Sequence, residues 1–205
     1  MNTEEEIIKR EWDFFQQAHN EGKRAACQDD WETFRIMRES QFDPWPEAVR
    51  ESYLQDLREA QEAGWNMVAE KYARMMESTA PEAYSGIAGQ LPACSPDKRA
   101  LTDAIVAIQV GWMEEFADEY PHLSGNARRI HTSEDTAWET SSETYLRGEL
   151  LTYSERTLQL YGQFVSQLAK KGENLNRMIM ERTAEKYGYR SLEDAESRCK
   201  MPEAD

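Results

Sequence analysis

Apolar residues recur every three or four positions along most of this chain, which is the spacing that places them on one face of an α-helix. The clearest stripe comprises Leu101, Ile105, Ile108, Trp112 and Phe116. Ser95 and Pro96 precede this stripe, and these residue types favour the N-cap and the first turn of a helix. We therefore predict a helix that begins near Pro96 and ends by Tyr120.

Similar stripes predict helices along the rest of the chain. They begin near residues 3, 30 and 46, continue past Gly64 to about 76, and return over 142–171, 174–187 and 191–196. We interpret Gly64 as a break between two helices, because a glycine often follows a helix C-terminus. Residues 79–95 and 122–141 are predicted as two long loops, since helix-breaking residues interrupt the stripes there.

Three short segments resemble segments later in the chain. Residues 51–55 resemble 143–147, residues 64–67 resemble 172–175, and residues 69–72 match 184–187. The distances between these segments differ along the chain, so they do not form a regular repeat. Two related helical hairpins and chance similarity in a Glu-rich helical sequence both explain them.

The composition favours helices over strands. Val and Ile together number only 13 of the 205 residues, whereas β-strands are rich in β-branched side chains. We predict an all-α fold, a single-domain helical bundle of about six to seven helices with two long loops. The domain is predicted to cover residues 1–200, and residues 201–205 are predicted to form a short tail.

The charge of the chain excludes several classes of protein. It has 24 Lys and Arg residues against 39 Asp and Glu residues, a net charge of −15 that opposes binding to nucleic-acid phosphates. No apolar run approaches the roughly 20 residues of a membrane span. The first residues are acidic where a secretion signal is basic, and 3 cysteines without a CxxC motif suit a reducing compartment. We expect a cytoplasmic protein that binds neither nucleic acid nor membranes.

Metal and nucleophile chemistry have little support in the sequence. A carboxylate-bridged metal centre in a helical bundle needs Glu-x-x-His pairs on two helices. Only Glu119 and His122 have this spacing, and Pro121 between them disrupts a helical turn. We predict no metal ion and identify no cofactor. Cys27 is interpreted as a packed small residue, because acids surround it and no motif of covalent catalysis is present.

The segment 143–154 carries the most informative side chains. On a helix, Tyr145, Glu149 and Tyr153 lie at positions i, i+4 and i+8 and share one face beside leucines. A carboxylate in apolar surroundings must reach solvent, pair with a cation or be protonated. Two interpretations follow: a structural ion pair inside the bundle, or a ligand pocket. In a pocket, Glu149, Tyr145 and Tyr153 are the candidate catalytic residues, with Glu149 as acid, base or hydrogen-bond acceptor.

Five cations are candidate ligand-binding residues: Arg128, Arg129, Lys71, Arg74 and Arg147. Arg128 and Arg129 form a basic cluster on an acidic background, and guanidinium groups pair well with carboxylate or phosphate groups. Solvated loop charges explain the same cluster. Acids one helical turn earlier explain Arg74 and Arg147 as surface ion pairs. Arg128, Arg129, Lys71 or Arg74 is expected to pair with Glu149.

Three segments carry a family resemblance: residues 28–30, residues 70–81 and above all residues 143–154. The last of these reads Glu-Thr-Tyr-Leu-Arg-Gly-Glu-Leu-Leu-Thr-Tyr-Ser. Together they resemble the uncharacterised bacterial domain-of-unknown-function family 4125, and the resemblance covers nearly the whole chain. It implies a bacterial, cytosolic protein but no reaction, cofactor or catalytic residue, because that family has none assigned. Some relatives are joined to a nucleotidyltransferase-like domain, which implies work near nucleotides or aminoglycoside-like substrates.

Two functions fit the sequence. The first is the binding or conversion of a small anionic or polar molecule in an interhelical pocket around Glu149. The second is a non-catalytic helical interaction module, which serves a partner enzyme such as a nucleotidyltransferase-like protein or forms a homodimer. A deep polar pocket at Glu149 favours the first function. Exposed side chains at Trp45 or at Met75 and Met76 favour the second. The sequence leaves open whether the protein is an enzyme.

Overall fold

The computed structural model describes residues 2–18 and 26–199. Within these ranges the regular elements are eleven α-helices and three short 3₁₀ helices, with no β-strand. The predicted all-α fold is confirmed, but the predicted number of six to seven helices is too low. The predicted tail, residues 201–205, lies outside the described residues.

The helices fall into two halves of the chain. The first half contains α1 (Thr3–Gln17), η1 (Ala26–Asp29), α2 (Trp31–Phe42), α3 (Glu47–Glu62), α4 (Met67–Thr79), α5 (Pro81–Ile87) and η2 (Ala88–Gln90). The second half contains α6 (Pro96–Glu119), α7 (Pro121–Gly125), η3 (Thr132–Glu134), α8 (Ser142–Leu150), α9 (Glu155–Lys171), α10 (Leu175–Lys186) and α11 (Leu192–Cys199). In the part of the chain that the structure describes, no helix combines the length and the apolar character needed to cross a membrane.

The additional helices have two sources. Both predicted loops contain a short helix, α5 and α7, and each begins with a proline in its first turn. The helix predicted over 142–171 is broken into α8 and α9. At the break, Ser154 accepts a hydrogen bond from the backbone N–H of Thr157 (3.1 Å), and the Thr152 hydroxyl donates to the carbonyl of Glu149 (2.7 Å). These hydroxyls replace hydrogen bonds of a continuous helix, so the chain turns between them.

Gly64 and Gly172 both end helices, as predicted. Their φ angles are 68° and 70°, in the left-handed region where glycine lacks the Cβ that other residues would strain. Two residues later, Asn66 and Asn174 cap the next helix, each accepting a hydrogen bond from the backbone N–H three residues ahead (2.9 and 3.0 Å). The same type of turn therefore joins α3 to α4 and α9 to α10.

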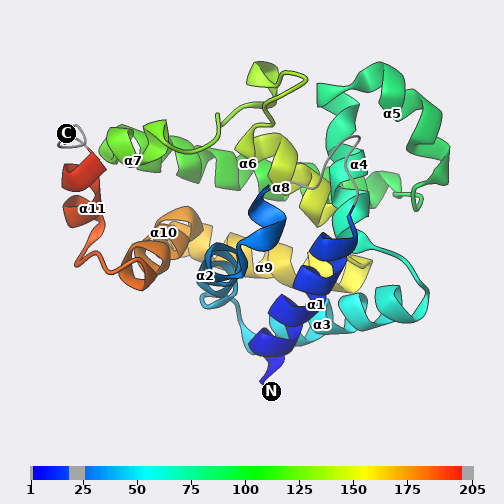
Figure 1. The fold of residues 1–205 in the computed structure, drawn as a ribbon, viewed down its shortest axis with the longest axis horizontal. Coiled ribbons are helices and arrows are strands. Elements are labelled where there is room, and N and C mark those ends of the chain that lie inside the picture. Colours follow the sequence, from blue (N-terminus) through cyan, green and yellow to red (C-terminus); the bar gives the residue numbers. More distant parts are fainter. Residues whose placement is uncertain (1, 19–25, 200–205) are drawn as a thin grey trace.

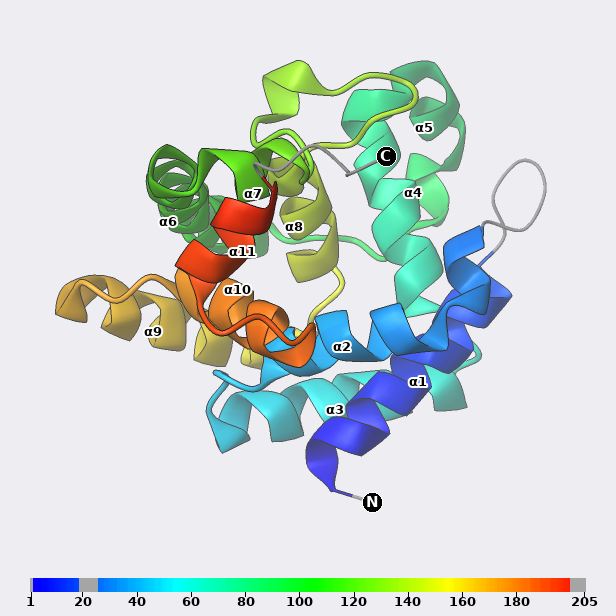
Figure 2. The ribbon, with the colours of Figure 1, turned by 60° about the vertical axis from the view of Figure 1, so that its left-hand side comes forward.

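The two halves pack on the same plan. Helix α1 packs on α2, α3 and α4, and α6 packs in the same way on α8, α9 and α10. The halves meet where α3 lies against α9, where α4 lies against α8 and where α2 lies against α10 (Figures 1 and 2). Helices α1, α2, α3 and α4 therefore correspond to α6, α8, α9 and α10, in that order. If each helix is exchanged with its counterpart, the set of contacts stays the same.

One of the three sequence similarities fits this plan. Residues 64–67 and 172–175 occupy equivalent turns between equivalent helices. Residues 51–55 lie in α3 whereas 143–147 lie in α8, and residues 69–72 lie near the start of α4 whereas 184–187 lie at the end of α10. Residues 51–55 and 143–147 are therefore not structurally equivalent, and neither are residues 69–72 and 184–187.

One apolar core is shared by both halves. Its most deeply buried side chains include Ile7, Phe42, Leu57, Leu150, Leu158, Val165 and Leu175. A smaller apolar cluster joins α6, α10 and α11 through Phe116, Tyr120, Ala184, Leu192 and Ala195. Burial of this apolar surface is the main force that holds the halves together, and it surrounds the polar side chains of the site with apolar neighbours.

Gly148 lets α8 approach α4 closely, and this approach is testable. A Cβ at Gly148 would lie 3.0 Å from Met75 Cγ and 3.1 Å from the carbonyl oxygen of Lys71, whereas one at Gly111 in α6 would meet nothing within 4 Å. We expect Gly148→Ala to lower the free energy of unfolding by about 1–3 kcal/mol. The matched Gly111→Ala should raise it by up to about 1 kcal/mol through helix propensity. Urea denaturation measures both, and stabilisation by both substitutions would contradict the close approach.

Candidate functional site

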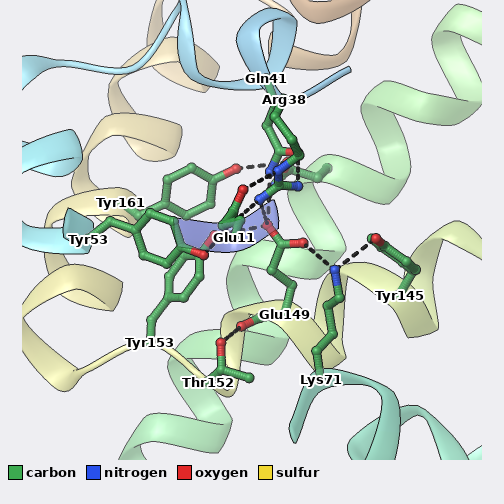
Figure 3. Close-up of polar contacts among 11 residues, drawn as sticks. Glu11, Arg38, Gln41, Tyr53, Lys71, Tyr145, Glu149, Thr152, Tyr153 and Tyr161 are labelled. Atoms are coloured by element: carbon green, nitrogen blue, oxygen red, sulfur yellow. Dashed lines mark hydrogen bonds and ion pairs between the residues drawn. The ribbon is translucent and has the colours of Figure 1, made fainter. Parts of the chain in front are cut away.

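The candidate site lies where α1, α2, α4 and α8 meet, with the Glu149 carboxylate near its centre (Figure 3). Glu149 is only 5% exposed. Its Oε1 accepts hydrogen bonds from Gln41 Nε2 (2.9 Å) and from the Tyr153 hydroxyl (3.1 Å). The Glu149 carboxylate therefore points into the bundle.

Two buried cations face this carboxylate from different helices. Arg38 Nη2 on α2 lies 3.3 Å from Glu149 Oε1, and Lys71 Nζ on α4 lies 3.3 Å from Glu149 Oε2. Of the four cations expected to pair with Glu149, Lys71 does so. The sequence did not single out Arg38, the second partner. Glu149 thus links α8 to both α2 and α4.

Arg38 is held from its other side by Glu11 of α1. Arg38 Nε donates to Glu11 Oε2 (2.6 Å), and Arg38 Nη2 donates to the other oxygen of the same carboxylate. The Tyr53 hydroxyl of α3 also donates to Glu11 Oε1 (2.6 Å). Arg38 Nη1 donates to Gln41 Oε1 (2.7 Å). This two-pronged pairing fixes the plane of the guanidinium and so fixes where it meets Glu149.

The two negative charges of Glu11 and Glu149 balance the two positive charges of Arg38 and Lys71. Burial alone would raise the pKa of Glu149, but the positive charges of Arg38 and Lys71 outweigh burial and lower this pKa from 4.5 to about 2. Burial raises the pKa of Tyr53 and of Tyr153 well above 10. At neutral pH Glu149 is therefore a carboxylate that accepts hydrogen bonds, and both phenols keep their protons.

Lys71 lies on the side of this cluster that faces Tyr145 (Figure 3). Burial would lower its pKa, but Tyr145 and Glu149 outweigh burial and raise it, so the ammonium is charged. Lys71 Nζ donates to the Tyr145 hydroxyl (2.7 Å) and lies 5.4 Å from the centre of the Tyr72 ring. An ammonium has three N–H donors. Among the described residues, Tyr145 and Glu149 are the oxygen partners of two of them.

Two phenols beside Lys71 are also incompletely hydrogen-bonded. The Tyr145 hydroxyl accepts from Lys71, and its own proton has no acceptor among residues 2–18 and 26–199. The Tyr72 hydroxyl forms no hydrogen bond within the same ranges. Burial raises the pKa of Tyr72 to about 12 despite the opposing charge of Lys71, so this phenol is also protonated. Both side chains are half-buried.

Arg128 reaches the same side of the cluster from the loop before α8. Its guanidinium carbon lies 5.0 Å from the centre of the Tyr145 ring, and its Nη1 donates to the carbonyl of Thr140 (3.2 Å). Asp135 anchors this loop by accepting hydrogen bonds from the hydroxyls of Ser78 (2.5 Å) and Thr144 (2.6 Å). The anchored loop therefore presents Arg128 over Tyr145.

The remaining predicted cations lie elsewhere. Arg129 is exposed, and its nearest acid is Glu134 at 3.9 Å. Arg74 is buried in a separate pair with Glu70 (2.8 Å) and donates to the carbonyl of Pro92 (2.8 Å). Arg147 points to Glu143 (2.8 Å) and Asp103 on the surface. The structure thus brings together Glu149, Tyr145, Tyr153, Lys71 and Arg128, but not Arg129, Arg74 or Arg147.

Sequence reasoning missed four side chains of the cluster: Glu11, Arg38, Gln41 and Tyr53. A usable signal was present for Glu11, which follows Ile7 and Ile8 and precedes Phe14 on one buried stripe of α1. A carboxylate at such a position needs a buried cation, by the same reasoning that singled out Glu149. Among the described residues, no group of three or more His, Cys, Asp and Glu side chains is placed to hold a metal ion.

The pKa of Glu149 predicts how its substitution alters acid stability. Glu149→Gln leaves two buried cations short of a partner, so we expect a loss of about 3–5 kcal/mol in the free energy of unfolding at pH 7. A carboxyl with a lowered pKa stabilises the fold above its unfolded pKa of 4.5 and ceases to do so as pH falls to about 2. The difference between the two proteins should therefore shrink between pH 5 and pH 2.

Urea denaturation across this pH range measures that difference. The exposed Glu51→Gln on α3 is the control, and it should change stability by less than about 0.5 kcal/mol at every pH. A constant gap between wild type and Glu149→Gln down to pH 2 would show that Glu149 is not ionised by its neighbours.

Comparison with known proteins adds a family but no activity. No curated protein and no solved structure matches the chain. A family model described as "Protein of unknown function (DUF4125)" matches residues 1–197. The segment 143–154, which carries the strongest resemblance, supplies Tyr145, Glu149 and Tyr153 to the site. The chain therefore belongs to the DUF4125 family.

Proposed function

We propose that this protein binds a small molecule through an anionic group on the side of the Glu149 cluster that faces Tyr145. The observation that carries the proposal is the buried ammonium of Lys71, which has a donor without an oxygen partner among the described residues. Buried charged groups are normally fully hydrogen-bonded. A ligand oxygen supplies the missing acceptor.

The groups around Lys71 suit an anion. The phenol protons of Tyr145 and Tyr72, which have no acceptor in residues 2–18 and 26–199, and the guanidinium of Arg128 are all donors. Glu11 and Glu149 carry two negative charges, against three positive charges on Arg38, Lys71 and Arg128. This group therefore has one excess positive charge on a protein whose net charge is −15. Carboxylate and phosphate are the anions that such donors bind well.

The residues proposed from the sequence as catalytic have different roles in this binding site. Glu149 holds Lys71 in place, and the Tyr153 hydroxyl donates its proton to Glu149. Tyr145 is the candidate for proton transfer to a bound ligand, because its proton is uncommitted within the described residues. The proposal is for binding; a bacterial, cytoplasmic setting remains a prediction from the sequence.

One observation favours the second candidate function, an interaction module. Trp138 is 94% exposed, and its turn is fixed by hydrogen bonds from the backbone of Trp138 and Glu139 to the Thr136 hydroxyl (3.2 and 3.0 Å). An ordered, exposed Trp is typical of binding surfaces. The residues named from the sequence for this role do not support it, since Trp45 and Met75 are buried and Met76 is half-buried.

Two adjacent arginines provide a matched test of anion binding. Arg128 lies over Tyr145, whereas Arg129 carries the same charge in the same loop but does not face the site. We expect Arg128→Gln to weaken the binding of inorganic phosphate or acetate by about 10- to 100-fold, the value of one hydrogen bond to a charged group. Arg129→Gln should leave the affinity within about twofold. Isothermal titration at constant ionic strength measures both.

The remaining outcomes distinguish the candidate functions. Tyr145→Phe should weaken the same anion, because it removes a phenol proton that has no acceptor among the described residues. It should also lower the free energy of unfolding by about 1–3 kcal/mol, because Lys71 loses the Tyr145 oxygen as an acceptor. Equal effects of the two arginine substitutions would indicate general charge screening and contradict the site. An absence of anion binding together with a dimer in sedimentation that Trp138→Ser dissociates would favour the interaction module.

A further inference from the structure

The two halves are equivalent at the level of single residues, not only of helices. Along α1 and α6, buried residues correspond at one constant spacing: Ile7 with Ile105, Ile8 with Val106, and Phe14 with Trp112. Phe42 and Leu150, the last residues of α2 and α8, correspond to each other, as do Trp45 and Tyr153 three residues later, and all four are buried. Equivalent helices therefore turn equivalent faces inward.

Hydrogen bonds repeat at equivalent positions as well. The Asn66 side chain donates to the carbonyl of Phe14 (2.8 Å), and Asn174 donates to the carbonyl of Trp112 (3.0 Å). The Tyr53 hydroxyl donates to Glu11 (2.6 Å), and the Tyr161 hydroxyl donates to Gln109 (3.2 Å). Neither pair of contacts follows from helical packing alone, because each depends on a specific side chain.

Contacts between aromatic rings show where the axis that relates the two halves lies. The Tyr53 and Tyr153 rings lie 4.8 Å apart, and the equivalent Tyr161 and Trp45 rings lie 5.0 Å apart. Gln41 and Glu149 are equivalent to each other, and they are joined by a hydrogen bond of 2.9 Å. When two halves are related by a two-fold axis, a contact between two equivalent side chains lies on that axis. The candidate site therefore lies beside this approximate two-fold axis.

The charges of the site break this symmetry. Glu11 corresponds to Gln109, Arg38 to Leu146, and Lys71 to Ile179. We infer that the chain is an internal duplication that once had two equivalent polar sites, of which the one in the second half has lost its charges. Glu11, Arg38 and Lys71 are the first-half residues that distinguish the remaining site from its neutral counterpart.

Two observations indicate that the charges at positions 109 and 146 were lost together. The carboxylate and its cationic partner are both replaced, so neither charge is left buried alone, which would be strongly destabilising. Gln109 Nε2 is buried and has no hydrogen-bond partner among the described residues. The equivalent atom in the first half is Glu11 Oε2, which accepts a hydrogen bond from Arg38 Nε. Gln109 Nε2 therefore faces the position that the side chain of an arginine at residue 146 would occupy. The inference does not depend on the proposed anion binding.

Rebuilding the lost pair tests the inference. Gln109→Glu places a buried carboxylate beside Tyr161 without a cation, and we expect it to lower the melting temperature by roughly 10 °C. Leu146→Arg should also lower it, because Leu146 packs against the core. In the double variant we expect the new pair to recover at least half of the loss caused by Gln109→Glu. Thermal denaturation of the four proteins gives this coupling directly.

A control without a cation and the reverse substitutions in the first half test whether any recovery of stability comes from the new ion pair. Leu146→Met combined with Gln109→Glu supplies no cation and should recover nothing. Imposing the neutral residues on the first half, Glu11→Gln with Arg38→Leu, should give a more stable protein than Arg38→Leu alone, because Glu11 is then not left as an unpaired charge. If both double variants are as unstable as the sum of their single variants, positions 109 and 146 are not the counterparts of 11 and 38, and the inference fails.

Discussion

The carboxylate of Glu149 is the point on which the arrangement of the site depends. It contacts Arg38 and Gln41 of α2, Lys71 of α4, and Tyr153 just beyond the end of its own helix. Through Arg38 it is also connected to Glu11 of α1 and then to Tyr53 of α3. Five helices are thereby linked by one chain of charge-assisted hydrogen bonds. Moving any one of these helices would leave a charge in an apolar region without its partner, so the network specifies their relative positions.

Such a network is not required by the packing itself. The second half packs α6, α8, α9 and α10 on the same plan with Gln109 and Leu146 in place of Glu11 and Arg38. Buried ion pairs seldom stabilise a protein more than apolar residues of similar size do. The charges of Glu11 and Arg38, which positions 109 and 146 lack, are therefore better explained by the chemistry of a site than by the stability of the fold. This difference between the halves does not depend on the donors of Lys71 and Tyr145 that have no acceptor in the described part of the chain.

The sequence predicted the helical class and the breaks at Gly64 and Gly172 because these features are local. Periodicity and a glycine after a helix are visible within a few residues of one another. The break before Ser154 was missed because hydroxyl side chains that replace backbone hydrogen bonds are also common inside helices. The spacing placed Tyr145, Glu149 and Tyr153 on one face of a single helix; this holds for Tyr145 and Glu149, whereas Tyr153 lies beyond the end of α8 and reaches Glu149 from the break. Their partners Arg38 and Glu11 lie on other helices. The contact of these helices with α8 depends on tertiary packing, which the spacing of residues along the chain does not reveal.

The contact between α4 and α8 has a consequence for the order in which the protein is made. Lys71 and its partner Glu149 are 78 residues apart in the chain, so a ribosome adding about 5–20 residues per second adds Lys71 roughly 4–16 s before it adds Glu149. During that interval α1–α4 can pair Glu11 with Arg38, but the surface of α4 that later receives Gly148 stays open to water. Met75 lies on that surface. The nascent first half is thus a stage at which an apolar face awaits its partner, and its aggregation or capture by chaperones competes with the arrival of α8.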